Sequence, residues 1–412
     1  MAFALWVGVS LGGAGCGPPA DDATPRDDST PLLELLSWWR APGEVEALQA
    51  LTHLHSGLHP GARTFNASVG RAAAMQKILA ERLMAGDPPD LLQVNAREVR
   101  QLRQRFPAAL ESLDDLFDTM GLRSIVFPEA LKEGTSGGHL VAMPINFHRE
   151  NNLFYNQAIF TAHHLTPPRT LAELVGLCGP LKAAGVTPLA TSHQGWILRI
   201  MFNAIAAGHM GGAAFRDYFT GKNAAAEPKL REALVIFSDL IHRCVNPDAG
   251  EPGFGWVNAA QTLFNGDAAM FIHGDWAKGY LTRIGWKPGI DFGVVAAPGT
   301  ADLFMYVADA FAIPRGAKNR TGAREFLTMA ASPAGQVAFN SIKGSSPVRP
   351  DVPMDALDLV ARATFADLQH AQIRMASPNI DALDAAFAKL VADHDTAAAA
   401  EVIAEYVRTR AP

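Results

Sequence analysis

The sequence lacks the short motifs by which nucleotide and metal sites are most easily recognised. It contains no CxxC pair, no HExxH, no P-loop and no GxGxxG. Basic residues form no uninterrupted run and the formal net charge is -6, so nothing predicts a nucleic-acid or polybasic membrane surface. Thirteen histidines are present, and we expect His53, His55 and His59 of THLHSGLH to lie on a solvated face. We therefore expect no cofactor, no metal and no nucleic-acid partner.

Cysteine is scarce, with three residues in 412. Cys16 ends the apolar stretch MAFALWVGVSLGGAGC, which is too short to span a bilayer and is typical of an export signal. We expect residues 1–16 to be a signal peptide, of lipoprotein type if Cys16 is lipidated, and residues 17–31 to be a flexible tether. A buried N-terminal strand, or a start codon set too late, is the alternative. The pair Cys178 and Cys244 predicts a disulfide in an exported protein, with two free thiols as the alternative.

Apolar runs and amphipathic stretches alternate after residue 31. LLELLSWW, RTFNAS and DLLQVNA predict strands, and EVEALQALTHLHSGL and AAAMQKILAERLMAG predict the helices between them. This order is typical of a parallel α/β sheet. Such sheets bind ligands at the carboxyl ends of their strands, which is where Trp38, Trp39, Gln93 and Asn95 fall.

Tryptophan placement is the unusual content of the chain. Trp38 and Trp39 are adjacent, so on a strand they point to opposite faces. An indole offers a flat apolar face that suits a pyranose ring, and amides and charged groups suit its hydroxyls. Aromatic walls with a polar rim would make a sugar site, although each tryptophan taken singly also fits a core position. The others after the N-terminal stretch are Trp196, Trp256, Trp276 and Trp286.

Six separated segments make the chain recognisable. They are SWW followed by Gly43-Glu44, MPINFHRENNLFYN, AQTLFNGDAAMFIHGDWAKGY, GIDFGVVAAPGT, VADAFAIPRGAKNRTGAREFL and AFNSIKGSSPVRPD. In order and spacing they resemble bacterial extracellular (periplasmic) solute-binding proteins of ABC sugar importers, and more narrowly the glucose-binding branch of that family. The resemblance implies an α/β fold of the two-lobe periplasmic-binding-protein type, type II-like, with the ligand cleft between lobes that close about a hinge.

The resemblance also implies how the chain divides. The N-terminal lobe takes residues 32–144 plus 309–345, and the C-terminal lobe takes residues 145–308 plus 346–412. MPINFH and the stretch around Tyr306 to Phe311 would be crossovers between the lobes. The cysteine pair, which the resemblance places on helices of the second lobe, also resembles members of this branch.

The same resemblance implies a set of ligand-binding residues. Trp38 and Trp39 match tandem tryptophans that pack against the sugar, and Gln93 matches a glutamine that bonds hydroxyls. Asn95 stands where the family usually has histidine, so it can donate and accept a hydrogen bond but cannot become charged. Asp275 is instead expected to cap or hold the turn before Trp276. The remaining matches are Glu44, His148, Trp256, Trp276, Asp309 and Lys343.

We therefore expect an exported binding protein, in the periplasm or cell envelope, that captures a monosaccharide without making or breaking a bond. Glucose is the first candidate; the family's late Ser-x-x-His-Gly segment is not evident, and His370 or Arg374 could replace its histidine. The partners would be the transmembrane subunits of an ABC permease, with a monomeric protein that meets the membrane only through a lipid anchor. Two alternatives stay open: delivery to a sensor, and a glycoside hydrolase with Glu44 and Asp309 as its carboxylate pair.

Overall fold

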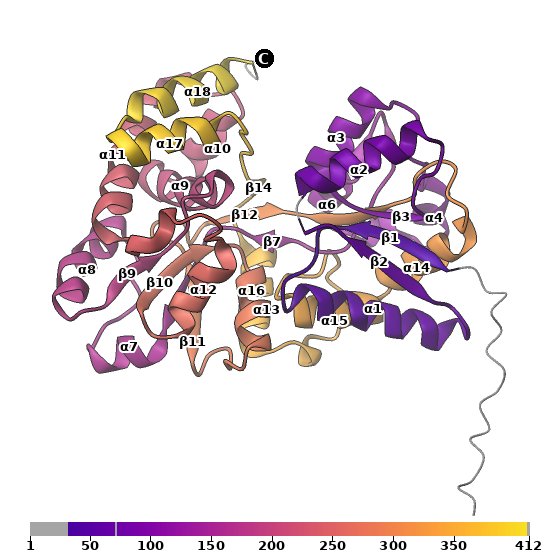
Figure 1. Ribbon diagram of the computed structural model, residues 1–412, viewed down its shortest axis with the longest axis horizontal. Coiled ribbons are helices and arrows are strands. Elements are labelled where there is room, and N and C mark those ends of the chain that lie inside the picture. Colours follow the sequence, from indigo (N-terminus) through magenta and orange to yellow (C-terminus); the bar gives the residue numbers. More distant parts are fainter. Residues whose placement is uncertain (1–31, 71, 410–412) are drawn as a thin grey trace, which may run out of the picture.

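The computed structural model describes residues 32–70 and 72–409. These residues form two α/β lobes that lie side by side and are joined by strands running between them (Figure 1). The predicted two-lobe α/β fold is thereby confirmed. The predicted signal peptide, the tether and the lipidation site Cys16 lie outside the described residues.

The first lobe is built on a five-stranded sheet with the order β2-β1-β3-β13-β6. Strands β2, β1 and β3 run parallel, and β13 pairs antiparallel with both β3 and β6. The strands are β1 (Leu33–Ser37), β2 (Thr64–Ser68), β3 (Leu91–Asn95), β6 (Met143–Pro144) and β13 (Asp309–Ala312), and a hairpin of β4 (Thr135–Ser136) and β5 (His139–Leu140) is separate. Because β13 comes from a distant part of the chain, this lobe is assembled from two segments.

Helices cover both faces of this first sheet (Figure 1). Leu35 packs in one cluster with Leu48 of α1, whereas the next residue, Leu36, packs in another with Met75 of α2, as alternation along a strand requires. The three strands and two helices predicted between residues 32 and 96 are confirmed. The helices are α1 (Glu44–Leu58), α2 (Ala72–Met84), α3 (Ala96–Arg105), α4 (Asp114–Thr119), α5 (Leu122–Ile125), α6 (Pro128–Glu133), α14 (Arg320–Ala331) and α15 (Pro333–Lys343).

The expectation that His55 lies on a solvated face is wrong. Its side chain is buried, with 1% of its surface exposed. The reason is helical spacing, because His55 follows the buried Leu48 and Leu51 on the inward face of α1. His53 lies on the exposed face and His59 is half-buried.

The second lobe surrounds a four-stranded sheet with the order β11-β8-β10-β9. Its strands are β8 (Asn152–Asn156), β9 (Thr187–Ala190), β10 (Ala268–His273) and β11 (Phe292–Ala296). Its helices are α7 (Gln157–Ala162), α8 (Leu171–Ala183), α9 (Gly195–Met210), α10 (Gly212–Phe219), α11 (Glu227–Cys244), α12 (Trp256–Phe264), α13 (Trp276–Arg283), α17 (Leu383–Asp393) and α18 (Thr396–Arg408), with short 3-10 turns at η1 (Ala224–Ala226) and η2 (Pro247–Gly250). A disulfide joins Cys178 of α8 to Cys244 at the end of α11, so the predicted pairing is confirmed.

Three strands between the lobes form a small sheet of their own, with the order β14-β12-β7 (Figure 1). They are β7 (His148–Arg149), β12 (Leu303–Val307) and β14 (Ile373–Ala376), and η3 (Met354–Ala356) and α16 (Leu359–His370) precede the last of them. The steps from β6 to β7 and from β12 to β13 carry the chain between the first sheet and this one, at the two crossovers expected from the sequence.

The residues that follow β13 are divided between the hydrophobic cores of the two lobes. Val348 and Phe365 pack with the first-lobe cluster, whereas Phe387 and Ile403 pack with the second-lobe cluster. The boundary proposed at residue 345 therefore stays a prediction, with residues up to α16 packing mainly on the first lobe.

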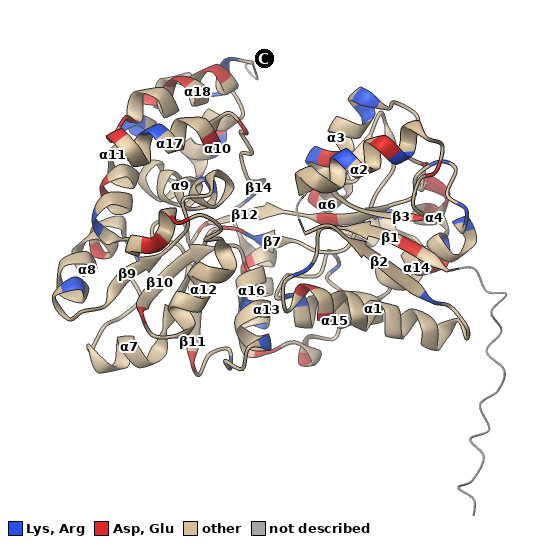
Figure 2. Cartoon of the chain, in the orientation of Figure 1, with Lys and Arg blue, Asp and Glu red and all other residues tan. Residues whose placement is uncertain are grey.

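Charged residues are spread over both lobes. Figure 2 shows acidic and basic residues interspersed along helices such as α11, α17 and α3. Among the helices of residues 32–70 and 72–409, none has the length and apolar character of a bilayer span.

Candidate functional site

A hollow of about 370 Å³ is lined by residues of both lobes. The first lobe contributes the segments after β1 and β2 and the first residue of α1, and the second lobe contributes the start of α12. Its lining residues are Trp38, Arg40, Ala41, Glu44, Val69, Gly70, Trp256 and Val257. The hollow therefore lies at the carboxyl end of β1, where a parallel sheet is expected to bind its ligand. Trp38, Glu44 and Trp256 were predicted as site residues, whereas Arg40 and Val257 were not.

Glu44 is held at the edge of this hollow by the turn before α1. Its Oε2 atom accepts hydrogen bonds from the backbone N–H groups of Arg40 at 3.2 Å and Ala41 at 3.1 Å. Its Oε1 atom accepts a hydrogen bond from Nζ of Lys343 at 3.1 Å. Gly43 has φ +86° and abuts the backbone of Gly279 in α13, so a side chain at position 43 would be strained and would clash.

The tandem tryptophans take different positions, as their opposite directions predicted. Trp38 is half-buried and lines the hollow, and its backbone N–H donates to Oε1 of Gln93 at 3.1 Å. Trp39 is buried in the first-lobe core against Phe311. Its ring lies 5.7 Å from Nζ of Lys343, so it supports the ammonium group by a cation–π contact. The structure thus places only Trp38 in the lining of the hollow.

A buried charge network lies at the crossover beneath the two lobes. The imidazole of His148, on β7, hydrogen-bonds through Nδ1 to Asp275 of the second lobe. Its Nε2 atom lies 3.2 Å from Oδ2 of Asp309, the first residue of β13 in the first lobe. Nε2 of Gln93 donates to Oδ1 of the same Asp309 at 3.5 Å. One histidine therefore joins a carboxylate from each lobe.

The electrostatics of this network favour a charged histidine. Burial lowers the pKa of His148, but the carboxylates of Asp275 and Asp309 outweigh burial, and the pKa lies above its ordinary value of 6.5. Burial raises the pKa of Asp309, yet the hydrogen bond and charge of His148 outweigh it, and the pKa lies below 3.8. Lys343 adds a second positive charge near both groups. The arrangement is an imidazole held between two carboxylates in a dry interior.

Asp275 was expected to cap α13 or to hold the turn before Trp276, and it does not cap the helix. It occupies the N-cap position, but its backbone is already helical, with φ -67° and ψ -12°, and its side chain makes no capping hydrogen bond. A capping residue usually has an extended backbone that turns its side chain toward the helix. Instead, Oδ2 of Asp275 accepts from the backbone N–H of Arg149 at 2.9 Å, and Oδ1 bonds His148. Asp275 thus ties α13 to the crossover strand.

Glycine at position 274 is required by the indole that follows. A Cβ atom on Gly274 would collide with the ring of Trp276. The ring lies edge-on to His148, with centroids 5.1 Å apart, and its Nε1–H donates to Nε2 of His273 at 3.0 Å. The Gly-Asp-Trp turn therefore brings an indole and a carboxylate against one imidazole.

An aromatic cluster surrounds His273, a residue that the sequence did not single out. The rings of Trp276, Trp196 and Trp256 lie 4.9, 5.6 and 5.9 Å from its ring. Burial lowers the pKa of His273 to about 3, so the ring is neutral and its Nε2 can accept the Trp276 hydrogen bond. The sequence signal that could have identified His273 was its place at the end of an apolar run, directly before Gly-Asp-Trp.

Like Gln93, His148, Trp276, Asp309 and Lys343, three further sequence candidates are not among the residues that line the hollow. Asn95 is the N-cap of α3, and its Oδ1 accepts from the backbone N–H groups of Arg97 and Glu98. Nδ1 of His370 is 2.7 Å from the backbone oxygen of Ala366, and Nε of Arg374 donates to Glu129 at 2.8 Å. The oxygen of Asn95 is therefore engaged by the helix, and the choice between the other two stays open.

Two α/β lobes, crossover strands between them and a polar and aromatic hollow at their junction define a two-lobe binding protein. Residues 66–337 match the family of bacterial extracellular solute-binding proteins, and the chain belongs to this family.

Curated relatives and solved structures agree with this assignment. An ABC transporter extracellular-binding protein of Pyrococcus horikoshii is 29% identical over 382 residues, which cover 91% of this chain and 85% of that protein. A "Probable sugar-binding periplasmic protein" of Mesorhizobium japonicum is 30% identical over 343 residues, which cover 82% of this chain and 81% of that protein. The structure of the bacterial solute receptor AcbH superposes with a TM-score of 0.76 at 15% identity, covering 92% of this chain and 97% of that one.

Proposed function

We propose that the protein captures a sugar between its lobes, a monosaccharide with glucose as the first candidate, and presents it to an ABC permease. The observation that carries the proposal is the hollow itself, which has Trp38 from one lobe and Trp256 from the other with Glu44 at its edge. Indole faces suit the C–H face of a pyranose, and a carboxylate accepts hydrogen bonds from its hydroxyls. Both lobes would hold the sugar, so binding would favour the closed arrangement.

The size of the hollow supports a small ligand. About 370 Å³ is near the lower end of the roughly 300–1,000 Å³ range of small-molecule pockets, which favours one sugar ring over a longer oligosaccharide. The relatives' names support a sugar as the class of ligand. The solved neighbours are described with different sugars, β-D-galactopyranose for AcbH and maltose for a Thermotoga maritima protein, so the choice among sugars belongs to experiment.

The carboxylates support binding rather than hydrolysis. A glycoside hydrolase needs two carboxyl groups flanking one scissile bond. Here Glu44 is paired with Lys343, and Asp309 is buried and paired with His148. We propose that these groups fix hydroxyls and lobe geometry and that no bond is made or broken. We also propose that the protein acts as a monomer in the periplasm or cell envelope, with or without a lipid anchor.

A thermal-shift screen tests the proposed function. The purified protein is heated with D-glucose, D-galactose, D-mannose, D-xylose, maltose or raffinose at several concentrations. A ligand that binds only the folded state raises the melting temperature in step with its concentration over its dissociation constant. We expect one monosaccharide to stand out by several degrees. A flat response to every sugar would contradict the proposal, and turnover of an aryl glycoside would favour the hydrolase instead.

A further inference from the structure

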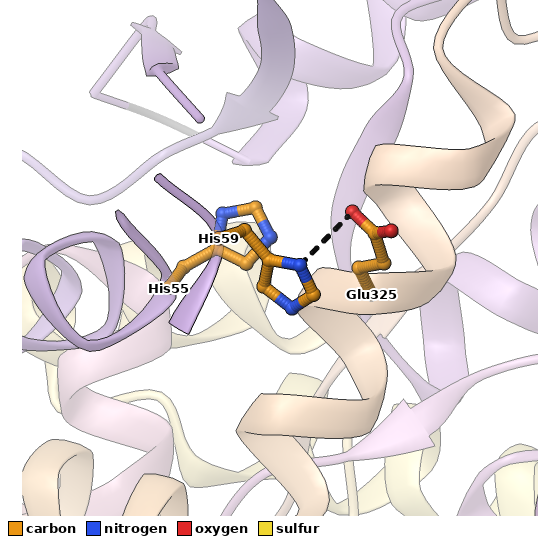
Figure 3. Close-up of side chains that lie close together, drawn as sticks. All are labelled: His55, His59 and Glu325. Carbon is orange, nitrogen blue, oxygen red and sulfur yellow. Dashed lines mark ion pairs between the residues drawn. The ribbon is translucent and has the colours of Figure 1, made fainter. Parts of the chain in front are cut away.

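Two histidines and a glutamate converge on the first lobe, away from the hollow between the lobes (Figure 3). His55 and His59 lie four residues apart on α1, which places them on one side of that helix. Glu325 reaches them from α14, the neighbouring helix. One ligand atom of each residue lies within 4.8 Å of those of the other two. Nδ1 of His59 is 3.5 Å from Oε2 of Glu325.

His55 is a buried histidine whose ring nitrogens have no hydrogen-bond partner among the described residues. Its side chain is 1% exposed, yet neither ring nitrogen has a hydrogen-bond partner in the part of the chain that the structure describes. Buried polar atoms are normally paired, and an unpaired one costs free energy. The ring instead packs against Phe326 on one side and lies 5.0 Å from the ring of His59 on the other. A cation between the two imidazoles would be coordinated by one of the two unpaired ring nitrogens of His55.

We propose that His55, His59 and Glu325 bind a divalent transition metal of the Zn²⁺ class. Two imidazoles and one carboxylate are a common ligand set for zinc with an open fourth position. Imidazole nitrogen disfavours Mg²⁺ and Ca²⁺, which prefer oxygen. Metal–ligand bonds of about 2.0–2.2 Å in a tetrahedral site hold ligand atoms roughly 3.3–3.6 Å apart. The His59 to Glu325 distance already fits, and a movement of about 1 Å by the imidazole rings would close the triad.

The site is reachable from solvent and separate from the hollow between the lobes. His59 and Glu325 are 36% and 41% exposed at their side chains. They also line a second hollow, of about 560 Å³, together with Arg324 and Thr328. Glu44 begins the same helix, and His55 follows eleven residues later, about 16 Å along the axis. Bound metal would therefore cross-link α1 to α14 without touching the proposed sugar.

Metal titration of the protein without a histidine tag tests the proposal. After treatment with EDTA and dialysis, Zn²⁺ is titrated by calorimetry, and Co²⁺ is followed by its visible absorption. We expect one site, a raised melting temperature with Zn²⁺, and a Co²⁺ spectrum of tetrahedral type. His59→Gln and Glu325→Gln, both at half-exposed positions where folding should survive, should each weaken binding by about tenfold or more.

The controls separate this site from other histidines. His53→Gln changes an exposed residue of the same helix and should leave Zn²⁺ affinity unchanged. His394→Gln breaks a second close histidine pair, His242 and His394, whose ring centroids lie 3.3 Å apart. This variant should also leave Zn²⁺ affinity unchanged. Absence of Zn²⁺ and Co²⁺ binding, unaltered affinity in His59→Gln, or loss only in His394→Gln would each overturn the proposal. Sugar affinity is measured beside it and should be the same with and without Zn²⁺.

Discussion

Nζ of Lys343 lies 3.1 Å from Oε1 of Glu44, so the end of α15 and the start of α1 form an ion pair at the edge of the hollow. The lysine side chain is 3% exposed and the glutamate side chain 15%. Charges removed from water to this degree need their partners. The ion pair therefore fixes the position of the Glu44 carboxylate in the lining of the hollow.

Removal of that lysine should abolish sugar binding. In Lys343→Ala, Glu44 loses its partner and Trp39 loses the ammonium above its ring, so the wall of the hollow is no longer fixed. We expect no measurable binding by calorimetry and a free energy of unfolding lower by roughly 1–3 kcal/mol. Circular dichroism checks that the protein stays folded. Unchanged affinity in this variant and in Asp309→Ala would contradict the assignment of the site.

The Gly-Asp-Trp turn should separate binding from stability. Trp276→Ala removes an indole that lies against His148 and His273, and we expect sugar affinity to fall by about tenfold or more, or about 1.4 kcal/mol. Asp275→Asn keeps the shape but weakens the charged bond to His148, so we expect mainly a lower melting temperature. Calorimetry and thermal unfolding of both variants are the measurements. Equal losses of affinity in the two variants would contradict the division of roles.

Stability should depend on pH through His148. Its pKa is above 6.5 in the folded protein, so its contribution to the free energy of unfolding is complete below pH 6.5 and is lost as pH rises through the folded pKa. The pKa of Asp309 is below 3.8, so its contribution is present above pH 3.8 and is lost as pH falls through the folded pKa. The contribution of the pair is therefore greatest between these limits.

Urea unfolding of the wild type and of His148→Gln measures this effect. The glutamine has no charge at any pH, so the stability gap between the two proteins should shrink as pH rises from about 6 to about 9. A gap that stays constant, or widens, over this range would mean that the pKa of His148 is not raised in the folded protein.

The disulfide should stabilise the second lobe without affecting the sugar. Cys178 and Cys244 are 66 residues apart in sequence, and closing such a loop contributes about 4 kcal/mol in the chain-entropy model. We expect the Cys178→Ala, Cys244→Ala double variant to unfold at lower urea concentration and to bind sugar as the wild type does. Unchanged urea stability of the double variant would show that the cross-link contributes little.

The first α/β elements could be predicted because their signals are local, whereas the two-lobe arrangement was implied by the resemblance of six separated segments to a known family. Alternation of apolar runs and amphipathic stretches placed the elements from β1 to β3. The adjacency of Trp38 and Trp39 indicated opposite directions for the two side chains, but it did not show which of them would be buried in the core. The partners of Asp275 could not be predicted, because Arg149 lies 126 residues away in sequence and its backbone N–H leaves no pattern. The burial of His55 could have been predicted from its helical spacing after Leu48 and Leu51. The polar composition of THLHSGLH pointed instead to a solvated face.

The most direct test of the central claim asks whether both lobes hold the sugar. The monosaccharide selected by the thermal-shift screen is titrated calorimetrically into the wild type, Trp38→Ala and Trp256→Ala, which change one wall from each lobe. Trp286→Phe is the matched control, because Trp286 packs against Phe264 and Phe292 in the second lobe. We predict that each alanine variant weakens binding by about tenfold or more and that the control binds as the wild type does. Wild-type affinity in either alanine variant would contradict binding between the lobes.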